Sequence, residues 1–196
     1  MQNTKVLLIC GSNRTGSFNQ QIMNAVESLL QKRGFQFETL QAEMQSLPIY
    51  TQDKEQDESF RKLTLSAQLK LAQADLILVA SPDYNGFFPP ILSNILTWIS
   101  RDFGKGRPLR ETTKVAGLIS ASPGNMGGIR MLPNLRDFLI ELGAVVHPTH
   151  VVVPQVNAKL DENGLLVDEE IRNKLNNLIT STVALLDGIK PLQAAA

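Results

Sequence analysis

Cysteine is almost absent from this chain, since Cys10 is the only one among 196 residues. A single cysteine excludes an intramolecular disulfide and any C-x-x-C metal motif. Long hydrophobic runs are also absent. No stretch approaches the ~20 apolar residues of a transmembrane helix, and Val6–Ile9 is too short for a signal-peptide core. We therefore expect a cytoplasmic protein with no membrane partner and no metal site.

An excess of charge of either sign is missing as well. The 19 Lys and Arg residues balance 19 Asp and Glu residues, and the formal net charge is +0. Nucleic acids and anionic membranes are bound through basic surfaces, so neither is an expected partner. With 43% hydrophobic and 19% charged residues, the composition is that of a globular chain. The length fits one domain over residues 1–196.

Strand and helix patterns alternate along the chain. The expected strands are Lys5–Cys10, Phe35–Leu40, Asp75–Ala80, Lys114–Ser120 and Val145–Val153. Helical patterns separate and follow them at 17–33, 59–73, 90–100, 131–142 and 168–179. This alternation predicts an α/β fold, a doubly wound five-stranded parallel sheet with helices on both faces. The polar segment Ala42–Glu58, which contains Pro48, is expected to be a long connecting loop.

Ligands of such sheets bind at the carboxyl ends of the strands, near the switch point. The loop after the first strand, Gly11–Asn19, has the composition of a phosphate site. Its small residues let backbone N–H groups approach a ligand. The following helix, capped by Ser17 with Gln20 in a capping-box pattern, points its positive dipole end there. The side chains that add hydrogen-bond donors or charge are Ser12, Arg14, Ser17 and Asn19. A capped surface turn remains the alternative.

Three other phosphate motifs do not fit this loop. A Walker A loop requires lysine after its second glycine, but Ser17 follows Gly16. A dinucleotide G-x-G-x-x-G is excluded because Asn13 occupies the second glycine position. Cys10 and Arg14 are separated by three residues, whereas the cysteine phosphatase loop has five. We expect Cys10 to be buried and inert.

The loops after the third and fourth strands suit a flat ligand with hydrogen-bonding edges. Prolines stiffen the loop Ser81–Pro90, where Tyr84 and Asn85 combine an aromatic surface with an amide. A rigid turn with an aromatic plug is the alternative. Three glycines lie among five residues at the end of Ser120–Gly128. We expect them to bring the backbone close to a ligand rather than to serve packing, with a flexible loop as the alternative.

At these residues the chain resembles the NADPH-dependent FMN reductase family, which includes bacterial quinone, azo and chromate reductases. Residues 11–19 match its G-S-x-R-x-x-S-x-N signature, and residues 82–86 match its P-E-Y-N-G block except for Asp83. Phe87 stands where a small residue is usual. Further matches lie at Leu47–Tyr50, Pro89, Leu92, Asn94, Trp98 and Ser122–Gly128.

The resemblance implies a flavodoxin-like fold, FMN as cofactor and NADPH or NADH as co-substrate. The electron acceptor would be a small molecule such as a flavin, quinone, azo compound or metal oxyanion. No catalytic side chain is expected, because the flavin carries the chemistry. The residues implied to bind FMN are Ser12, Arg14, Ser17, Phe18, Asn19, Pro82, Asp83, Tyr84, Asn85, Gly86, Ser122, Gly124, Gly127 and Gly128.

Two alternatives to an enzyme are a flavodoxin-type electron carrier and an FMN-binding regulatory protein. Electron carriers of this type are typically strongly acidic, whereas this chain is neutral. Steady NAD(P)H oxidation would distinguish the enzyme from both alternatives. We interpret His147 and His150, by the fifth strand, as structural.

The segment Pro90–Ser100 predicts a helix that is apolar on more than one face. Its apolar residues are Ile91, Leu92, Ile95, Leu96, Trp98 and Ile99. Such a helix must be buried on more than one side. We therefore expect a homodimer or homotetramer through this helix, with Phe87 or Phe88 in the contact. The family resemblance implies the same assembly.

Overall fold

Five parallel strands form one sheet in the computed structural model, which describes residues 4–104, 106–111 and 114–193. The strands are β1 (Lys5–Cys10), β2 (Gln36–Thr39), β3 (Leu76–Ala80), β4 (Val115–Ala121) and β5 (Val145–Val153). Their order is β2-β1-β3-β4-β5, and each neighbouring pair is parallel. The doubly wound α/β fold expected from the sequence is therefore confirmed.

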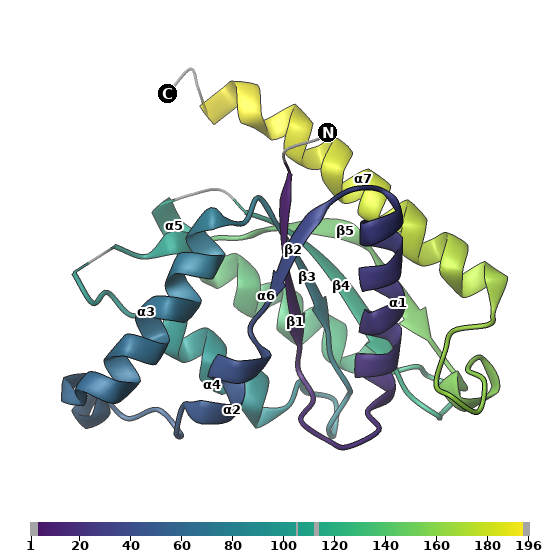
Figure 1. Cartoon of the computed structure of the whole chain (residues 1–196), viewed down its shortest axis with the longest axis horizontal. Coiled ribbons are helices and arrows are strands. Elements are labelled where there is room, and N and C mark those ends of the chain that lie inside the picture. Colours follow the sequence, from purple (N-terminus) through teal and green to yellow (C-terminus); the bar gives the residue numbers. More distant parts are fainter. Residues whose placement is uncertain (1–3, 105, 112–113, 194–196) are drawn as a thin grey trace.

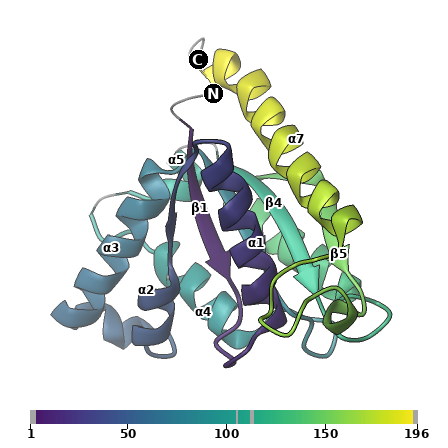
Figure 2. The ribbon, with the colours of Figure 1, turned by 45° about the vertical axis from the view of Figure 1, so that its right-hand side comes forward.

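Helices cover both faces of the sheet, as Figures 1 and 2 show. One face carries α1 (Phe18–Lys32) and α7 (Glu169–Gln193). The other carries α2 (Gln41–Ser46), α3 (Glu58–Gln73), α4 (Pro90–Ile99) and α6 (Leu132–Glu141). The short α5 (Pro108–Glu111) precedes β4. Within the described residues, no helix is both long and apolar enough to cross a membrane.

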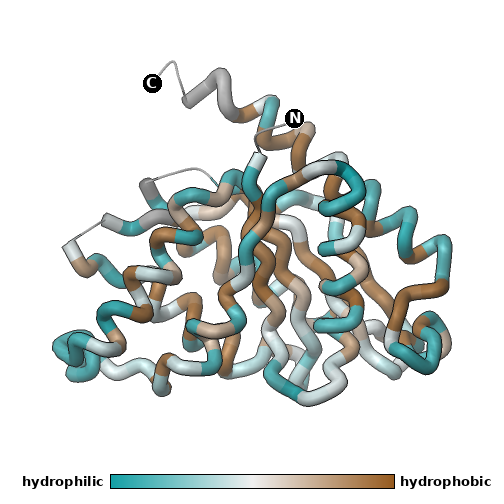
Figure 3. Tube along the Cα trace, in the orientation of Figure 1, coloured by the Kyte–Doolittle hydropathy of each residue, from teal (hydrophilic) through white to brown (hydrophobic). Residues whose placement is uncertain are grey.

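The central strands β1, β3 and β4 are almost entirely buried because each face of the sheet contacts a helical layer. The edge strand β2 is mostly exposed. In β1, Val6 and Leu8 belong to the core under α1 and α7, whereas Leu7 and Ile9 belong to the core on the opposite face. This division follows from the alternation of side chains along a strand. Figure 3 shows the resulting apolar centre, with polar residues on the outer surfaces of the helices.

The prediction that Ala42–Glu58 is one long loop is wrong. The helix α2 begins at Gln41, and a 3₁₀ helix occupies Gln52–Gln56. The buried side chains of this short helix are Glu43 and Met44, and a single buried apolar residue leaves no apolar periodicity in the sequence. The turn between the two helices is fixed by α4, since Asn94 Nδ2 and Trp98 Nε1 both donate to the Pro48 carbonyl, at 2.8 and 2.9 Å.

The helix α4 does not need a second copy of the chain to bury its second apolar face, contrary to the prediction. Five of its six large apolar side chains are at most 1% exposed within a single chain, namely Leu92, Ile95, Leu96, Trp98 and Ile99, and Ile91 is half-buried. One side of α4 faces the core of the sheet, and the other contacts α2 and α3. The second apolar face is thus buried intramolecularly. The sequence could not show this, because α2 was not predicted.

The start of α1 forms only half of the expected capping box. The hydroxyl oxygen of Ser17 accepts from the backbone N–H of Gln20 at 3.4 Å. The side chain of Gln20 does not return to the cap; its Nε2 donates instead to Asn24 Oδ1 at 2.9 Å. The end of α1 is as expected, with Gly34 at φ +74° directly after the C-cap residue.

Candidate functional site

The loops that follow β1, β3 and β4 meet at the carboxyl edge of the sheet, at the bottom of Figure 1. The backbone N–H of Gly11 donates to Ala80 at 2.8 Å and joins the first loop to the end of β3. The Ser120 hydroxyl donates to the Ser81 carbonyl at 2.8 Å and joins the ends of β3 and β4. The structure therefore brings the three candidate loops together and links them through hydrogen bonds.

The first loop presents several free hydrogen-bond donors. Ser12 and Ser17 are buried, and their hydroxyl oxygens accept from the N–H groups of Arg14 and Gln20, at 3.4 Å each. Each hydroxyl proton remains available to a ligand. In the described chain, the N–H groups of the first two residues of α1 have no partner, as at any helix start. Free donors at the start of a helix are a favourable position for an anion.

Arg14 supplies a positive charge to this site. Its guanidinium is exposed, donates to the Gly16 carbonyl at 2.8 Å and lies 5.2 Å from the centroid of the Phe18 ring. Among the described residues no carboxylate pairs with it. Gly16 has φ +67° with open space around it, so a glycine stands here because the turn requires a positive φ. The uncompensated charge of Arg14 favours a bound anion.

Asn19 has a different role from the one expected from the sequence. Its side chain is 2% exposed and bonds to Ala121 at the end of β4 rather than standing open to the loop. What Asn19 offers directly to a ligand is its backbone N–H in the first turn of α1. The second N–H of its amide has no partner within the described residues.

The second loop contains a tight two-residue turn. Tyr84 and Phe87 exchange backbone hydrogen bonds of 2.8 and 3.1 Å. Asn85 and Gly86 have φ values of 59° and 85°, as a type I′ turn requires. The Asn-Gly pair is the sequence signal for this turn. Tyr84 is 47% exposed and presents its ring at the carboxyl edge.

Two side chains clamp this turn from opposite sides. Asp83 Oδ1 accepts from the Gly86 N–H at 2.6 Å, and Asn134 Nδ2 donates to the Gly86 carbonyl at 2.8 Å. Arg130 Nε lies 3.6 Å from Asp83 Oδ2. Sequence reasoning missed Asn134 and Arg130, because neither belongs to a motif and only the fold places them beside the second loop.

The glycines of the third loop are explained largely by packing, which corrects the sequence argument. A Cβ at Gly127 would lie 2.3 Å from Val152 Cγ1 and 2.8 Å from the Pro154 nitrogen. A Cβ at Gly128 would lie 2.1 Å from Ser120 Oγ. Both glycines are buried and have positive φ values of 57° and 85°. The chain needs them to lay the loop against β4 and β5.

Gly124 differs from these two glycines. It is exposed, and the nearest atom to an added Cβ is Ser122 Oγ at 3.7 Å. Ser122 is half-buried beside it. Of the four third-loop residues expected to bind FMN, these two are accessible, whereas Gly127 and Gly128 are buried.

No nucleophile or acid–base pair faces these loops among the described residues. Burial raises the pKa of the Cys10 thiol to about 11, so the cysteine is protonated and unreactive. His147 is buried on β5, where its Nδ1 accepts from the Thr149 N–H at 3.1 Å. Burial and the nearby Arg136 lower the pKa of His150, also on β5.

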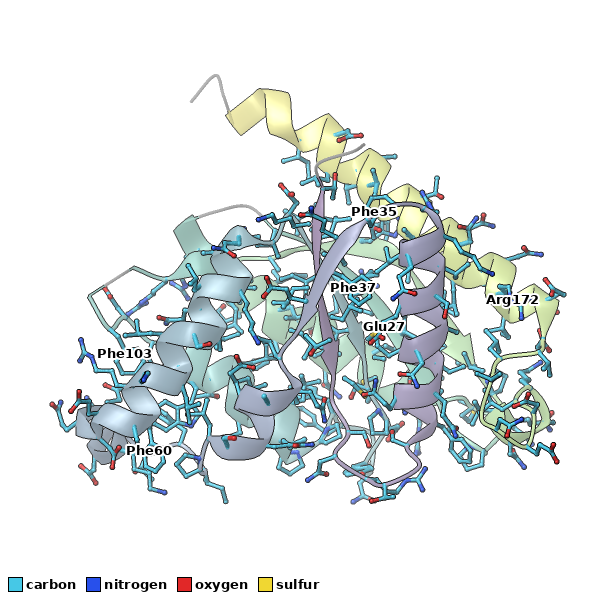
Figure 4. The ribbon with its side chains drawn as sticks, viewed as in Figure 1. Glu27, Phe35, Phe37, Phe60, Phe103 and Arg172 are labelled. Atoms are coloured by element: carbon cyan, nitrogen blue, oxygen red, sulfur yellow. The ribbon has the colours of Figure 1, made fainter. Side chains whose placement is uncertain are left out.

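Two cavities flank α1, away from the three loops. One has about 360 Å³ and is lined by Glu27, Thr39 and their neighbours. Figure 4 shows Glu27 reaching from α1 toward β2, and burial raises the pKa of its carboxyl. The other has about 380 Å³ and lies between α1 and the segment around Leu165. No residue of the carboxyl-edge loops 11–19, 81–90 and 120–128 lines either of these two cavities.

Comparison with known proteins gives one family. A family model described as NADPH-dependent FMN reductase matches residues 4–158. A 2-hydroxy-1,4-benzoquinone reductase from Burkholderia sp is 29% identical over 185 residues, covering 92% of this chain and 94% of the relative. An NAD(P)H-dependent FMN reductase from Pseudomonas aeruginosa is 30% identical over 177 residues, covering 86% of this chain and 87% of the relative.

The fold has a solved counterpart. FerB from Paracoccus denitrificans, described as a flavoenzyme NAD(P)H:(acceptor) oxidoreductase, superposes with a TM-score of 0.77. The match covers 94% of this chain and 98% of FerB at 21% sequence identity. At that identity the likeness supports the flavodoxin-like fold.

Proposed function

We propose that this chain, which belongs to the NADPH-dependent FMN reductase family, binds FMN and transfers electrons from NAD(P)H to a small acceptor. The observation that carries the proposal is the group of free hydrogen-bond donors at the start of α1, linked to two further loops on one sheet edge. The relatives support an enzyme rather than an electron carrier or a regulatory protein, because they are named as reductases.

The residues present fit FMN. A single phosphate matches one compact site that offers two buried hydroxyls, free N–H groups and an unpaired guanidinium. The phosphate would be held by Ser12, Arg14, Ser17 and the N–H groups of Phe18 and Asn19. The ring would lie against Pro82–Gly86, with Ser122 and Gly124 at another edge. The sequence holds no second phosphate motif, which favours FMN over FAD.

The protein contributes position and charge rather than a reacting side chain. When bound, FMN supplies the hydride and electron transfer that amino-acid side chains do not perform. Arg14 would neutralise the phosphate, since its charge has no other partner among the described residues. Asp83 and Asn134 hold the Asn85–Gly86 turn in one conformation. A loop fixed beforehand loses less entropy when a ligand binds.

A flat apolar acceptor such as a quinone fits the surface beside the turn. Phe87 is 49% exposed and stacks on Phe88 at 4.3 Å, and Phe88 stacks on Phe138 at 5.4 Å. Tyr84 is exposed on the same loop. Aromatic rings favour stacking with another planar ring. The Burkholderia relative is named as a quinone reductase, which agrees with this choice.

Titration of the purified protein with FMN tests the cofactor, with quenching of flavin fluorescence as the signal and FAD as the control. We expect FMN to bind at micromolar concentration and the loaded protein to oxidise NAD(P)H steadily when a quinone is present. Binding of FAD in preference to FMN would contradict the cofactor assignment. Binding of FMN without NAD(P)H oxidation would favour the electron carrier or the regulatory protein.

Self-association as a homodimer or homotetramer remains part of the proposal, with support different from the original argument. Ile95 is fully buried, so Ile95→Glu would unfold the chain rather than test an interface. The exposed apolar side chains of the carboxyl-edge loops are the better candidates for an interface between subunits, and Phe87→Ser is the variant that tests them. Light scattering on the wild type should show a dimer or a larger assembly.

A cytoplasmic location is likewise proposed and is tested by cell fractionation.

A further inference from the structure

The side chain of Asn19 forms a bridge between two loops far apart in the sequence. Its Nδ2 donates to the Ala121 carbonyl at 2.9 Å, and its Oδ1 accepts from the Ala121 N–H at 3.0 Å. These partners fix the orientation of the amide, because a flipped amide would set donor against donor and oxygen against oxygen. The start of α1 is thereby tied to the end of β4, and Figure 2 shows these ends close together.

The backbone groups of Ala121 are free to bond to Asn19 because the neighbouring strand β3 has already left the sheet. The last bond from β3 to β4 runs from the Ser81 N–H to the Ile119 carbonyl at 3.0 Å. If the ladder continued, the Ala121 N–H would donate to the Ser81 carbonyl and the Ala121 carbonyl would accept from the Asp83 N–H. The Ser81 carbonyl accepts from the Ser120 hydroxyl instead, and the Asp83 N–H makes no bond to β4 among the described residues. Residues two apart in a strand direct their backbone groups to the same side, so Ala121 faces the gap. The Asn19 amide takes the place of the missing peptide.

We infer that Asn19 is a positioning residue that couples the phosphate loop to the loop after β4, so that both parts of the flavin site depend on it. This inference rests on the proposed function. The first turn of α1 carries the free N–H groups, and Ser122 and Gly124 follow directly after Ala121. A flavin that contacts the first loop through its phosphate and the third loop through its ring therefore depends on the bridge at both ends.

A flavin without phosphate separates this role from a direct phosphate contact. We expect Asn19→Ala to weaken FMN and riboflavin binding by similar factors, each about tenfold or more. It should also change the absorption spectrum of FMN bound at saturation. Arg14→Ala should weaken FMN alone and leave that spectrum unchanged. Loss of FMN affinity with riboflavin affinity and spectrum intact overturns the inference, as does unchanged affinity for both flavins.

Leu30→Ala is the control for lost stability, because Leu30 is fully buried in the last turn of the same helix. It should lower the unfolding temperature and leave both flavin affinities unchanged. An equal loss of flavin in Leu30→Ala would show that Asn19→Ala acts through stability alone, which also overturns the inference.

Hydrogen exchange tests the bridge without any flavin. Asn19→Ala should speed exchange of the Ala121 amide proton, and an unchanged rate would overturn the bridge. If the wild type binds no FMN while this exchange still responds to Asn19→Ala, the proposed function fails and the bridge stands. The two failures are therefore distinguishable.

Discussion

At the scale of a single residue, we assign Arg14 to phosphate binding because its charge has no partner of opposite sign in the described chain. Its guanidinium has carbonyl and aromatic contacts but no carboxylate partner in the described chain. A charged hydrogen bond to phosphate is worth about 1.5–3 kcal/mol. We expect Arg14→Ala to weaken FMN binding about ten- to a hundredfold in a fluorescence titration. Arg110→Ala, whose guanidinium pairs with Glu141, is the matched control and should bind FMN normally.

Cys10 gives a second test at the scale of one residue. Burial raises the pKa of its thiol to about 11, so roughly one molecule in a thousand carries the reactive thiolate at pH 8. We expect a thiol reagent to label the folded protein at least about a hundredfold more slowly than the protein in denaturant. Equally fast labelling in both states would show that the thiol is accessible and not inert.

At the scale of an element, the third loop offers a matched pair of glycines. Gly127→Ala would force a methyl group into Val152 and the Pro154 backbone at a residue with φ +57°. Overpacking and backbone strain together cost about 2–4 kcal/mol, or a fall of about 5–15 °C in the unfolding temperature. The methyl group of Gly124→Ala would meet only Ser122 Oγ, at an ordinary contact distance of 3.7 Å, so this variant should unfold near the wild-type temperature. Equal temperatures for the two variants would contradict the packing explanation.

The turn at Asn85–Gly86 and the helix α2 differ in how far the sequence alone can predict them. Asn-Gly predicts a turn locally, because both residues accept the positive φ values that a type I′ turn requires. The helix α2 depends on burial of Met44 against distant residues, which no short window contains. The sequence analysis gave a rigid turn in this loop as the alternative to a ligand loop, whereas it did not predict α2 at all.

At the scale of the whole molecule, we propose that the three loops form one flavin site, which reductant and acceptor would occupy in turn. With NAD(P)H and a quinone varied together, we expect parallel lines in double-reciprocal plots of the initial rate. Separate sites that are occupied at the same time would give intersecting lines. The exposed rings of Tyr84 and Phe87 beside the proposed site agree with alternate occupation of one surface by the two substrates.

The sequence by itself determined the strand and helix alternation, the parallel sheet and the loops at its carboxyl edge. These features follow from local apolar patterns and from the rule that parallel strands end together. Tertiary structure decided what each loop residue does. Asn19 became a bridge because β3 leaves the sheet before β4 does. Gly127 and Gly128 serve packing, and α4 is buried on both sides, because Val152, Ser120 and α2 approach them only in the folded chain.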